Sequence, residues 1–508
     1  MSTFAAVDIG ANSVRLKIAR WEHGMLNIIH EDRQVTRLGE QVFKDGILSP
    51  EAMADTIKAL RRFHRTAQKY AVRTVRVVGT SALREARNRE TFCDWVSTTT
   101  GWQVEVISGI EEARLIHLGI VSNLKIRLWP VLLVDLGGGS CELTISSRGR
   151  IRETVSLPLG AVRLTDEFLR KDPPRKKELE RLSGFIGREL GRVAKRIAAA
   201  RVRTVIATSG TAAALAAVAA VRYRSSRGED QVSASMARRL ARMLSRRTIQ
   251  QRRAFPGIGP RRAEIIVAGA LVFAELLERC RLGGFRFSPL GLRDGLLAQM
   301  AAEHDRGARS RRRIESERWQ SILASARHYN VELEHATAVR RFAQQLFRSL
   351  KQLHQLPGDY EEWISAAAML YEVGAYINRN GRYRHTWYIV SHSEILGYTP
   401  QQRAVIAAIA RYVGKSRPSS SDAPLKAVAA AERANIMKAC LVLRLARALS
   451  LGRNNAVTAL RLQLRPTRLT LRVKPKRGAT AELEIWAAEK EGRYFREAFG
   501  RELVVEAA

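Results

Sequence analysis

Two copies of one short motif bring together residue types that bind phosphate and metal ions. The first copy is Val7-Asp8-Ile9-Gly10-Ala11-Asn12-Ser13, and the second is Val134-Asp135-Leu136-Gly137-Gly138-Gly139-Ser140. A glycine-rich turn after a strand directs backbone N–H groups at an anion. An aspartate before such a turn often only caps it, but two matched copies favour two half-domains that hold one phosphate-bearing ligand from both sides.

The motifs predict a ligand set. We expect Asp8 and Asp135 to bind Mg²⁺, which prefers hard oxygen ligands and keeps waters and substrate phosphates around it. The loop residues are expected to donate N–H and hydroxyl groups to phosphate oxygens. These predicted phosphate-binding loop residues are Gly10, Asn12, Ser13, Gly137, Gly138, Gly139 and Ser140.

A hydrolase also needs a base that activates water. Glu111 and Glu112 begin a predicted helix directly after a strand, although acidic residues in a first helical turn are also common for dipole reasons. Because adjacent helical residues point in different directions, only one of them faces the cleft, and the local pattern does not choose between them. Arg84 follows Gly79-Thr80-Ser81 and is either a phosphate clamp or a surface arginine.

Two further features carry weaker signals. Ser209-Gly210-Thr211 ends a strand and opens a helix, which predicts either a third anion site or a plain turn. Cys141 follows the second loop, where a small buried residue is more common than a reactive thiolate.

Composition limits the classes of protein. The chain has 508 residues, a formal net charge of +37 and four scattered cysteines. The charge indicates a polyanion partner or a generally arginine-rich composition. The cysteines are typical of a reducing cytosol. No apolar run approaches the roughly 20 residues of a membrane span, so we expect a cytoplasmic protein without a membrane partner.

The elements that must position these residues alternate between strand and helix over residues 1–302. Two hairpins are expected around the motif turns, from Phe4–Asp8 with Val14–Arg20 and from Val131–Asp135 with Glu142–Ser147. Further strands are expected at 72–78, 103–107, 151–157 and 204–208, and helices after Ser49, after Ser108 and over 173–200. Near the C-terminus, 469–473 and 480–487 alternate like strands.

This organisation predicts five segments. They are half-domain I (1–125), half-domain II (126–303), a linker (304–314), a helical domain (315–455) and a small α+β region (456–508).

The motifs together resemble the exopolyphosphatase / guanosine pentaphosphate phosphohydrolase family. The matching stretches are 5–13, Gly79-Thr80-Ser81-Ala82-Leu83-Arg84, 107–115 and 134–140, with weaker matches at 159–163, 209–211 and 288–295. The resemblance implies an α/β fold with two actin-like (ribonuclease H-like) ATPase-fold half-domains that flank a cleft, followed by an all-α HD-like domain and a small α+β C-terminal region.

The resemblance also implies roles for single residues. The catalytic base falls on Glu112, and the metal-associated carboxylates fall on Asp8, Asp135 and Glu142. The phosphate contacts fall on the two loops, on Arg84, and on Gly210 and Thr211. One departure is visible, because Cys141 stands where the family usually has threonine, and a thiol donates hydrogen bonds poorly.

The resemblance implies that the protein removes the terminal phosphate of inorganic polyphosphate. This reaction is expected to depend on Mg²⁺, with Mn²⁺ as an alternative ion. This is the reaction of a phosphoric-anhydride hydrolase. The alternatives are a guanosine pentaphosphate 5′-phosphohydrolase, a non-catalytic regulator that binds polyphosphate or an alarmone nucleotide, and a sugar kinase. We expect no specific nucleic-acid partner.

The helical region resembles the HD-type domain of the family's long members. Tyr371 and Glu372 stand where a metal-binding His-Asp pair is expected, and His335, His385 and His392 do not complete a metal set. We therefore predict a catalytically dead domain that binds a polyanion or forms a homodimer. We expect three residues near Tyr383 to serve that purpose, namely Arg382, Arg384 and His385. The alternative is that they belong to a solvated loop.

Overall fold

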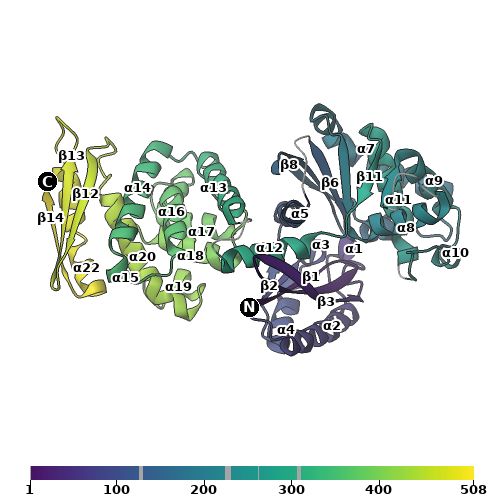
Figure 1. Ribbon diagram of the computed structural model, residues 1–508, viewed down its shortest axis with the longest axis horizontal. Helices are drawn as coiled ribbons and strands as arrows, with labels where there is room; N and C mark the ends of the chain where they lie inside the picture. The colour runs from purple at the N-terminus through teal and green to yellow at the C-terminus, as the bar shows by residue number, and fades with distance from the viewer. Residues whose placement is uncertain (1, 125–129, 224–229, 261, 306–310) are drawn as a thin grey trace. The chain divides into compact units, whose positions relative to one another are not determined.

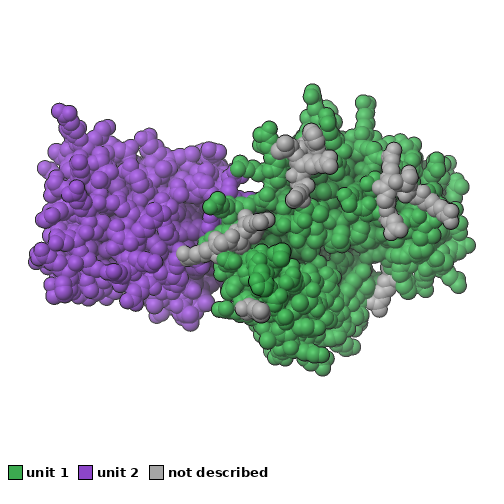
Figure 2. Space-filling model, viewed as in Figure 1, with its two compact units in different colours: residues 1–313 green, residues 314–508 purple. Residues whose placement is uncertain are grey.

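The computed structural model describes residues 2–124, 130–223, 230–260, 262–305 and 311–508. Its chain divides into two compact units, residues 1–313 and residues 314–508 (Figure 2). Among the described residues, no helix combines the length and apolarity that a membrane crossing needs.

The first unit begins with a five-stranded sheet in the order β3-β2-β1-β4-β5 (Figure 1). Its strands are β1 (Ser2–Ile9), β2 (Ser13–Glu22), β3 (Met25–Val35), β4 (Thr74–Gly79) and β5 (Val104–Val106). The helices of this segment are α1 (Val42–Asp45), α2 (Pro50–Lys69), α3 (Ser81–Glu85), α4 (Arg89–Thr100) and α5 (Gly109–Asn123). As predicted, Ser49 caps α2, because its side chain accepts from the N–H of Ala52 and Pro50 fills the first turn.

A six-stranded sheet follows, in the order β10-β11-β9-β6-β7-β8. Its strands are β6 (Val131–Leu136), β7 (Cys141–Ser147), β8 (Arg150–Leu157), β9 (Thr204–Thr208), β10 (Gln231–Ser233) and β11 (Gly284–Phe287). The helices are α6 (Ala161–Phe168), α7 (Lys176–Ala199), α8 (Ser209–Tyr223), α9 (Ala234–Ser245), α10 (Ile249–Arg253), α11 (Arg262–Arg279) and α12 (Leu292–His304).

The two sheets repeat one topology. In the first, β1 pairs antiparallel with β2 and parallel with β4. In the second, β6 pairs antiparallel with β7 and parallel with β9. The order β8-β7-β6-β9-β11 therefore reproduces β3-β2-β1-β4-β5, with β10 added at the edge. This repeat agrees with the expected mixed α/β fold and the two expected motif hairpins, although β3 and β11 were not predicted.

Helices α5 and α12 lie between the two sheets and build a shared core. Buried side chains from β1 and β6 pack there against Leu115 of α5 and Leu296 of α12. The helices cross so closely that a Cβ atom on Gly295 would lie 1.8 Å from the carbonyl oxygen of Leu115. This core sets the relative position of the two motif turns.

The second unit is helical at first and ends in a small sheet. Its elements are α13 (Arg311–His328), α14 (Leu333–Ser349), α15 (Lys351–His354), α16 (Tyr360–Leu370), the 3₁₀ helix η1 (Val373–Tyr376), α17 (Arg382–His392), α18 (Pro400–Arg411), α19 (Ala423–Lys426), α20 (Ala430–Ala448), β12 (Val457–Leu464), β13 (Arg468–Pro475), α21 (Glu482–Glu489), α22 (Gly492–Phe499) and β14 (Glu502–Ala507). The sheet order is β12-β13-β14.

One predicted strand is wrong. Residues 480–487 fall mostly in helix α21, whose buried residues Glu484, Ala487 and Ala488 follow helical spacing. The segment is rich in alanine, glutamate and leucine, which are strong helix formers, and this outweighs a short alternating pattern. The third strand of the sheet comes instead from β14, which pairs parallel with β13.

The predicted five-segment division stays a prediction. Residues 306–310 of the expected linker at 304–314 lie outside the described residues. On either side of them, α12 ends at His304 and α13 begins at Arg311.

Candidate active site

The two motif turns have the same local geometry. The N–H of Gly10 donates to the carbonyl oxygen of Ser13 at 3.2 Å, and the N–H of Gly137 donates to that of Ser140 at 3.0 Å. Each turn is also held by the segment that follows the third strand of its sheet. Gly39 N–H donates to Ala11 in the first copy, and Ala161 N–H donates to Gly137 in the second.

The two turns meet. A Cβ atom on Gly138 would lie 2.9 Å from Cβ of Ala11 and 3.3 Å from the nitrogen of Asn12, so only glycine fits there. Within the part of the chain that the structure describes, the N–H groups of Ala11, Asn12 and Gly138 donate no hydrogen bond. All three residues line a cleft in the first unit, where such donors suit phosphate oxygens.

The cleft has a volume of about 370 Å³ and gathers many of the predicted residues. Those that line it are Asp8, Gly10, Asn12, Ser13, Glu112, Asp135, Gly137, Gly138, Ser140 and Gly210. The other predicted residues lie behind this lining. Gly139 packs against Phe43, Thr211 is buried beside Gly269, and Arg84 and Glu142 contact the lining residues from behind.

Three carboxylates form an acidic cluster, which we define as Glu112, Asp135 and Glu142. Their ligand atoms all lie within 4.8 Å of one another. Burial raises the pKa of all three side chains, that of Glu112 to about 7. Burial likewise raises the pKa of Asp8, whose charge acts on Glu112 and Asp135, although Asp8 is not part of the cluster.

One oxygen of the acidic cluster lacks a hydrogen-bond partner among the described residues. Ser156 Oγ donates to Glu142 Oε1 at 2.8 Å, whereas Oε2 of Glu142 is buried without a hydrogen-bond partner among the described residues. A bare buried carboxylate oxygen beside two other carboxylates is costly, and a divalent cation with oxygen ligands would satisfy it. The residues present therefore fit a hard metal ion.

Glu111 and Glu112 have different surroundings. Glu111 accepts two hydrogen bonds of 2.8 Å from Arg114, which is almost fully buried and also donates to Gln299. Glu112 points to the other side, where its Oε2 accepts from Arg84 at 2.8 Å. Glu112 lines the cleft, and none of the described residues donates a hydrogen bond to its Oε1.

Arg84 connects the acid to the second loop. It donates to Glu112 Oε2, to the carbonyl oxygen of Ile107 at 2.9 Å and to Ser140 Oγ at 3.3 Å. Its position on α3 follows from Thr80, whose N–H bonds to Ile9 and whose carbonyl accepts from Arg84 N–H.

Four arginines that were not among the predicted site residues stand close to one another at the cleft. This arginine cluster comprises Arg15, Arg33, Arg262 and Arg293, and all but Arg262 line the cleft. Burial and the guanidinium groups of Arg33 and Arg15 lower the pKa of Arg262 to about 9. Burial and the positive charge of Arg15 also lower the pKa of Arg293. Such mutual repulsion is relieved by a bound polyanion.

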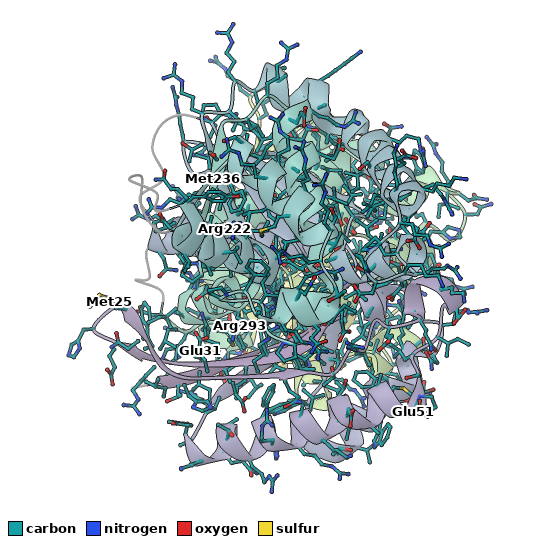
Figure 3. All side chains as sticks on the ribbon, turned by 90° about the vertical axis from the view of Figure 1, so that its right-hand side faces the viewer. Met25, Glu31, Glu51, Arg222, Met236 and Arg293 are labelled. Carbon is teal, nitrogen blue, oxygen red and sulfur yellow. The ribbon has the colours of Figure 1, made fainter. Side chains whose placement is uncertain are left out.

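Ion pairs fix one side of this cluster. Arg293 donates to the carbonyl oxygen of Leu16 at 2.9 Å and lies 3.8 Å from Glu31 (Figure 3). The buried Lys17 bridges Glu31 and Asp294 at 2.9 and 2.8 Å. Arg15 and Arg293 lie within or beside recognisable motifs. Arg33 and Arg262 carry no sequence signal, because lysine and arginine total 86 residues in this chain.

Fold and cleft together define an α/β protein whose first unit contains a cleft lined by glycine-rich turns, carboxylates and arginines. The model of the Ppx/GppA phosphatase family matches residues 17–304, and the model of Ppx/GppA phosphatase domain III matches residues 318–491. The chain therefore belongs to the Ppx/GppA phosphatase family.

Solved structures agree with this assignment. The chain is 26% identical to an exopolyphosphatase from Cytophaga hutchinsonii, over 59% of this chain and 98% of that one, with a TM-score of 0.56. It is 31% identical to a Ppx/GppA family member from Aquifex aeolicus, over 60% of this chain and 99% of that one, with a TM-score of 0.51.

Proposed function

We propose that this protein is an exopolyphosphatase that hydrolyses the terminal phosphate of inorganic polyphosphate, with Glu112 as general base. The observation that carries the proposal is the position of Glu112 on the cleft, between two phosphate-type loops and beside Asp135 and Glu142. A pKa near 7 suits a base that works at neutral pH.

Each group has a task in this proposal. Glu112 Oε1 accepts a proton from the attacking water, while Arg84 holds Oε2 and fixes the orientation of the carboxylate. The free N–H groups of Ala11, Asn12 and Gly138 bind the terminal phosphate and stabilise its oxygens as charge shifts. The arginine cluster binds the remaining phosphates of the polyphosphate molecule.

Asp135 and Glu142, with Asp8 nearby, are proposed to hold Mg²⁺ or Mn²⁺. When bound, the ion supplies positive charge that neutralises the buried carboxylates and the phosphate oxygens. The partnerless Oε2 of Glu142 supports this role.

The substitution Glu112→Gln tests the base. We expect phosphate release from polyphosphate to fall about 10²- to 10⁴-fold, the usual contribution of a general base, with polyphosphate binding retained. Glu180→Gln, which makes the same change on the exposed surface of α7, is the control. Full activity of Glu112→Gln, or equal loss in both variants, would exclude Glu112 as the base.

A guanosine pentaphosphate 5′-phosphohydrolase is the second candidate, and one observation favours it. Phe287, Leu290 and Ala213 add apolar surface to the same cleft, next to Gly210. Such a surface suits a nucleoside, which polyphosphate lacks. Parallel assays of phosphate release from both substrates in Mg²⁺ distinguish the two enzymes. Tight binding of either without phosphate release would instead support the non-catalytic regulator.

For the second unit we propose a degenerate HD-like domain without catalytic activity. We also propose the five-segment division given above and a homodimeric protein. The buried His335 Nε2 lies 2.6 Å from the hydroxyl of Tyr371, and its Nδ1 lies 3.3 Å from Ser450 Oγ. Arg453 pairs with Glu332 and Glu372 beside them. These contacts support a filled polar network in place of a metal site.

A further inference from the structure

The hairpin formed by β12 and β13 is strongly basic. Residues 457–477 contain seven basic residues and no acidic residue; the basic residues are Arg461, Arg465, Arg468, Arg472, Lys474, Lys476 and Arg477. All seven are exposed. This density exceeds that of the chain as a whole, in which 49 acidic residues accompany 86 basic ones.

The strands sort these charges onto one face of the sheet. Leu469, Leu471 and Val473 of β13 are buried against the helices of the second unit. Because side chains alternate along a strand, Arg468, Arg472 and Lys474 point to the opposite face, which we call the open face. In the register of the hairpin, Arg461 of β12 stands directly opposite Arg472 (Figure 1 shows the strands).

Acidic partners reach only part of this face. Glu502 and Glu506 of β14 pair with Arg468 and Arg472, at 3.2 and 2.6 Å. Within the described structure, no ion pair involves Arg461, Arg465 or Lys474. A like-charged pair such as Arg461 opposite Arg472 destabilises a sheet. An anion bound across the two strands would remove that cost.

The other residues of the open face indicate which anion fits. They are Ala459 and Gln463 of β12, Thr470 of β13 and Val504 of β14, so the described face carries no aromatic side chain that could stack on a base. Single-stranded nucleic acids are usually bound by grooves with such aromatic groups. A duplex presents its phosphates outward and keeps its bases stacked, so it needs no stacking partner.

We propose that the open face of β12 and β13 binds double-stranded nucleic acid through its phosphates, without sequence preference. Arg461 and Arg472 stand opposite each other on strands about 4.8 Å apart, and Lys474 follows Arg472 after about 7 Å. Arg461 and Arg465, and likewise Arg468 and Arg472, are four positions or about 13 Å apart. An open sheet face, which does not surround its ligand, suits a rigid duplex, whereas a flexible chain gains more from a groove that surrounds it. The proposed site belongs to the second unit, whereas the residues of the proposed phosphatase cleft belong to the first.

Salt-dependent binding of the full-length protein tests the proposal. Affinity for two fluorescent 20-base-pair duplexes of unrelated sequence is measured by anisotropy between 50 and 200 mM salt. The triple variant Arg461→Gln, Arg465→Gln, Lys474→Gln should lower the slope of log K against log salt by about 0.9 for each lost phosphate contact, or roughly 2.7 in total. Both duplexes should lose affinity equally.

A matched triple variant separates this face from net charge. Arg61→Gln, Arg65→Gln, Lys69→Gln removes the same charge from the exposed surface of α2 and should leave the slope within about one unit. Thermal unfolding and phosphatase activity verify that both variants are folded. Equal slopes in the two variants, a preference for single strands, or loss of polyphosphate binding with duplex binding intact would each overturn the proposal.

Discussion

At the scale of residues, two adjacent glutamates are distinguished by the arginines they meet. Glu111 is fixed by the buried Arg114, and Glu112 meets Arg84 at the cleft. The sequence predicts that only one of them faces the ligand, because helical neighbours diverge. It does not reveal which, because the residues that decide lie elsewhere in the chain. Arg84, the partner of Glu112, comes from α3, and Gln299, which contacts Arg114 beside Glu111, comes from α12.

The buried carboxylates predict a pH-dependent stability in metal-free protein. Burial raises the pKa of Glu112 from 4.5 to about 7, so the folded state holds this proton more tightly than the unfolded state. The resulting stabilisation is present below about pH 4.5 and is lost as the pH rises to about 7, at a cost on the order of 3 kcal/mol. The unfolding temperature of chelator-treated protein should therefore fall between pH 5 and pH 8.

Divalent ions should reverse this loss. We expect Mg²⁺ to raise the unfolding temperature more at pH 8 than at pH 5, because the ligands must be ionised to bind it. Glu142→Gln should reduce the effect of Mg²⁺, and Glu180→Gln on the exposed surface of α7 should not. An effect of Mg²⁺ that is the same at both pH values in the native protein would contradict a metal site built from these carboxylates.

At the scale of elements, one residue of α6 joins the two halves of the first unit. Arg163 Nε donates to the carbonyl oxygen of Gly139 at 2.7 Å, and its guanidinium pairs with Glu85 of α3 and lies 4.1 Å from the centre of the Phe43 ring. Glu85 is adjacent to Arg84, which holds Glu112. Arg163 therefore links the second phosphate loop to the element that orients the proposed base.

Loss of this link should slow the reaction more than it weakens binding. We expect Arg163→Ala to lower kcat for polyphosphate about 100-fold, the cost of a small misplacement of reacting groups, with a smaller change in KM. A double-mutant cycle with Glu85→Gln should show coupling between the two sites. Arg181→Ala on the exposed face of α7 is the control. Additive effects, or a change in KM alone, would argue against this positioning role.

The elements themselves were largely predictable, and the failures have physical causes. The motif hairpins were confirmed, because buried apolar runs end at glycine turns. The edge strand β3 has no fully buried residue, and its apolar residues Met25, Leu26, Ile28 and Ile29 do not alternate strictly with polar ones, so its sequence lacks the period of a half-buried strand. Residues 480–487 alternate like a strand yet form α21, because helix-forming residues pack against the core at helical spacing. The pairing of β13 with β14 depends on a contact across many residues, which local patterns do not contain.

At the scale of the molecule, the arginines that produce the net charge of +37 have different surroundings. Many arginines are neutralised by nearby carboxylates, such as Arg62 by Asp32 and Arg444 by Glu491. The arginine cluster differs, because Arg15, Arg33, Arg262 and Arg293 act on one another at the cleft. Composition alone did not separate these two groups. The difference depends on which side chains the fold brings together.

This arrangement predicts how salt affects turnover of polyphosphate. In single-stranded nucleic acids each phosphate contact contributes about 0.7 to the slope of log affinity against log salt. If the four arginines of the cluster contact polyphosphate in this way, KM should rise roughly 50-fold between 50 and 200 mM salt, while kcat changes little. The reason is that salt competes with binding of the chain, whereas the bound terminal phosphate is held by short-range contacts. Arg33→Gln should lower the slope of log KM against log salt by about 0.7. Arg181→Gln, which removes an equal charge from the exposed surface of α7, should leave it unchanged. A kcat that falls in parallel with binding, or a slope insensitive to Arg33, would contradict a cleft that holds its substrate through these cations.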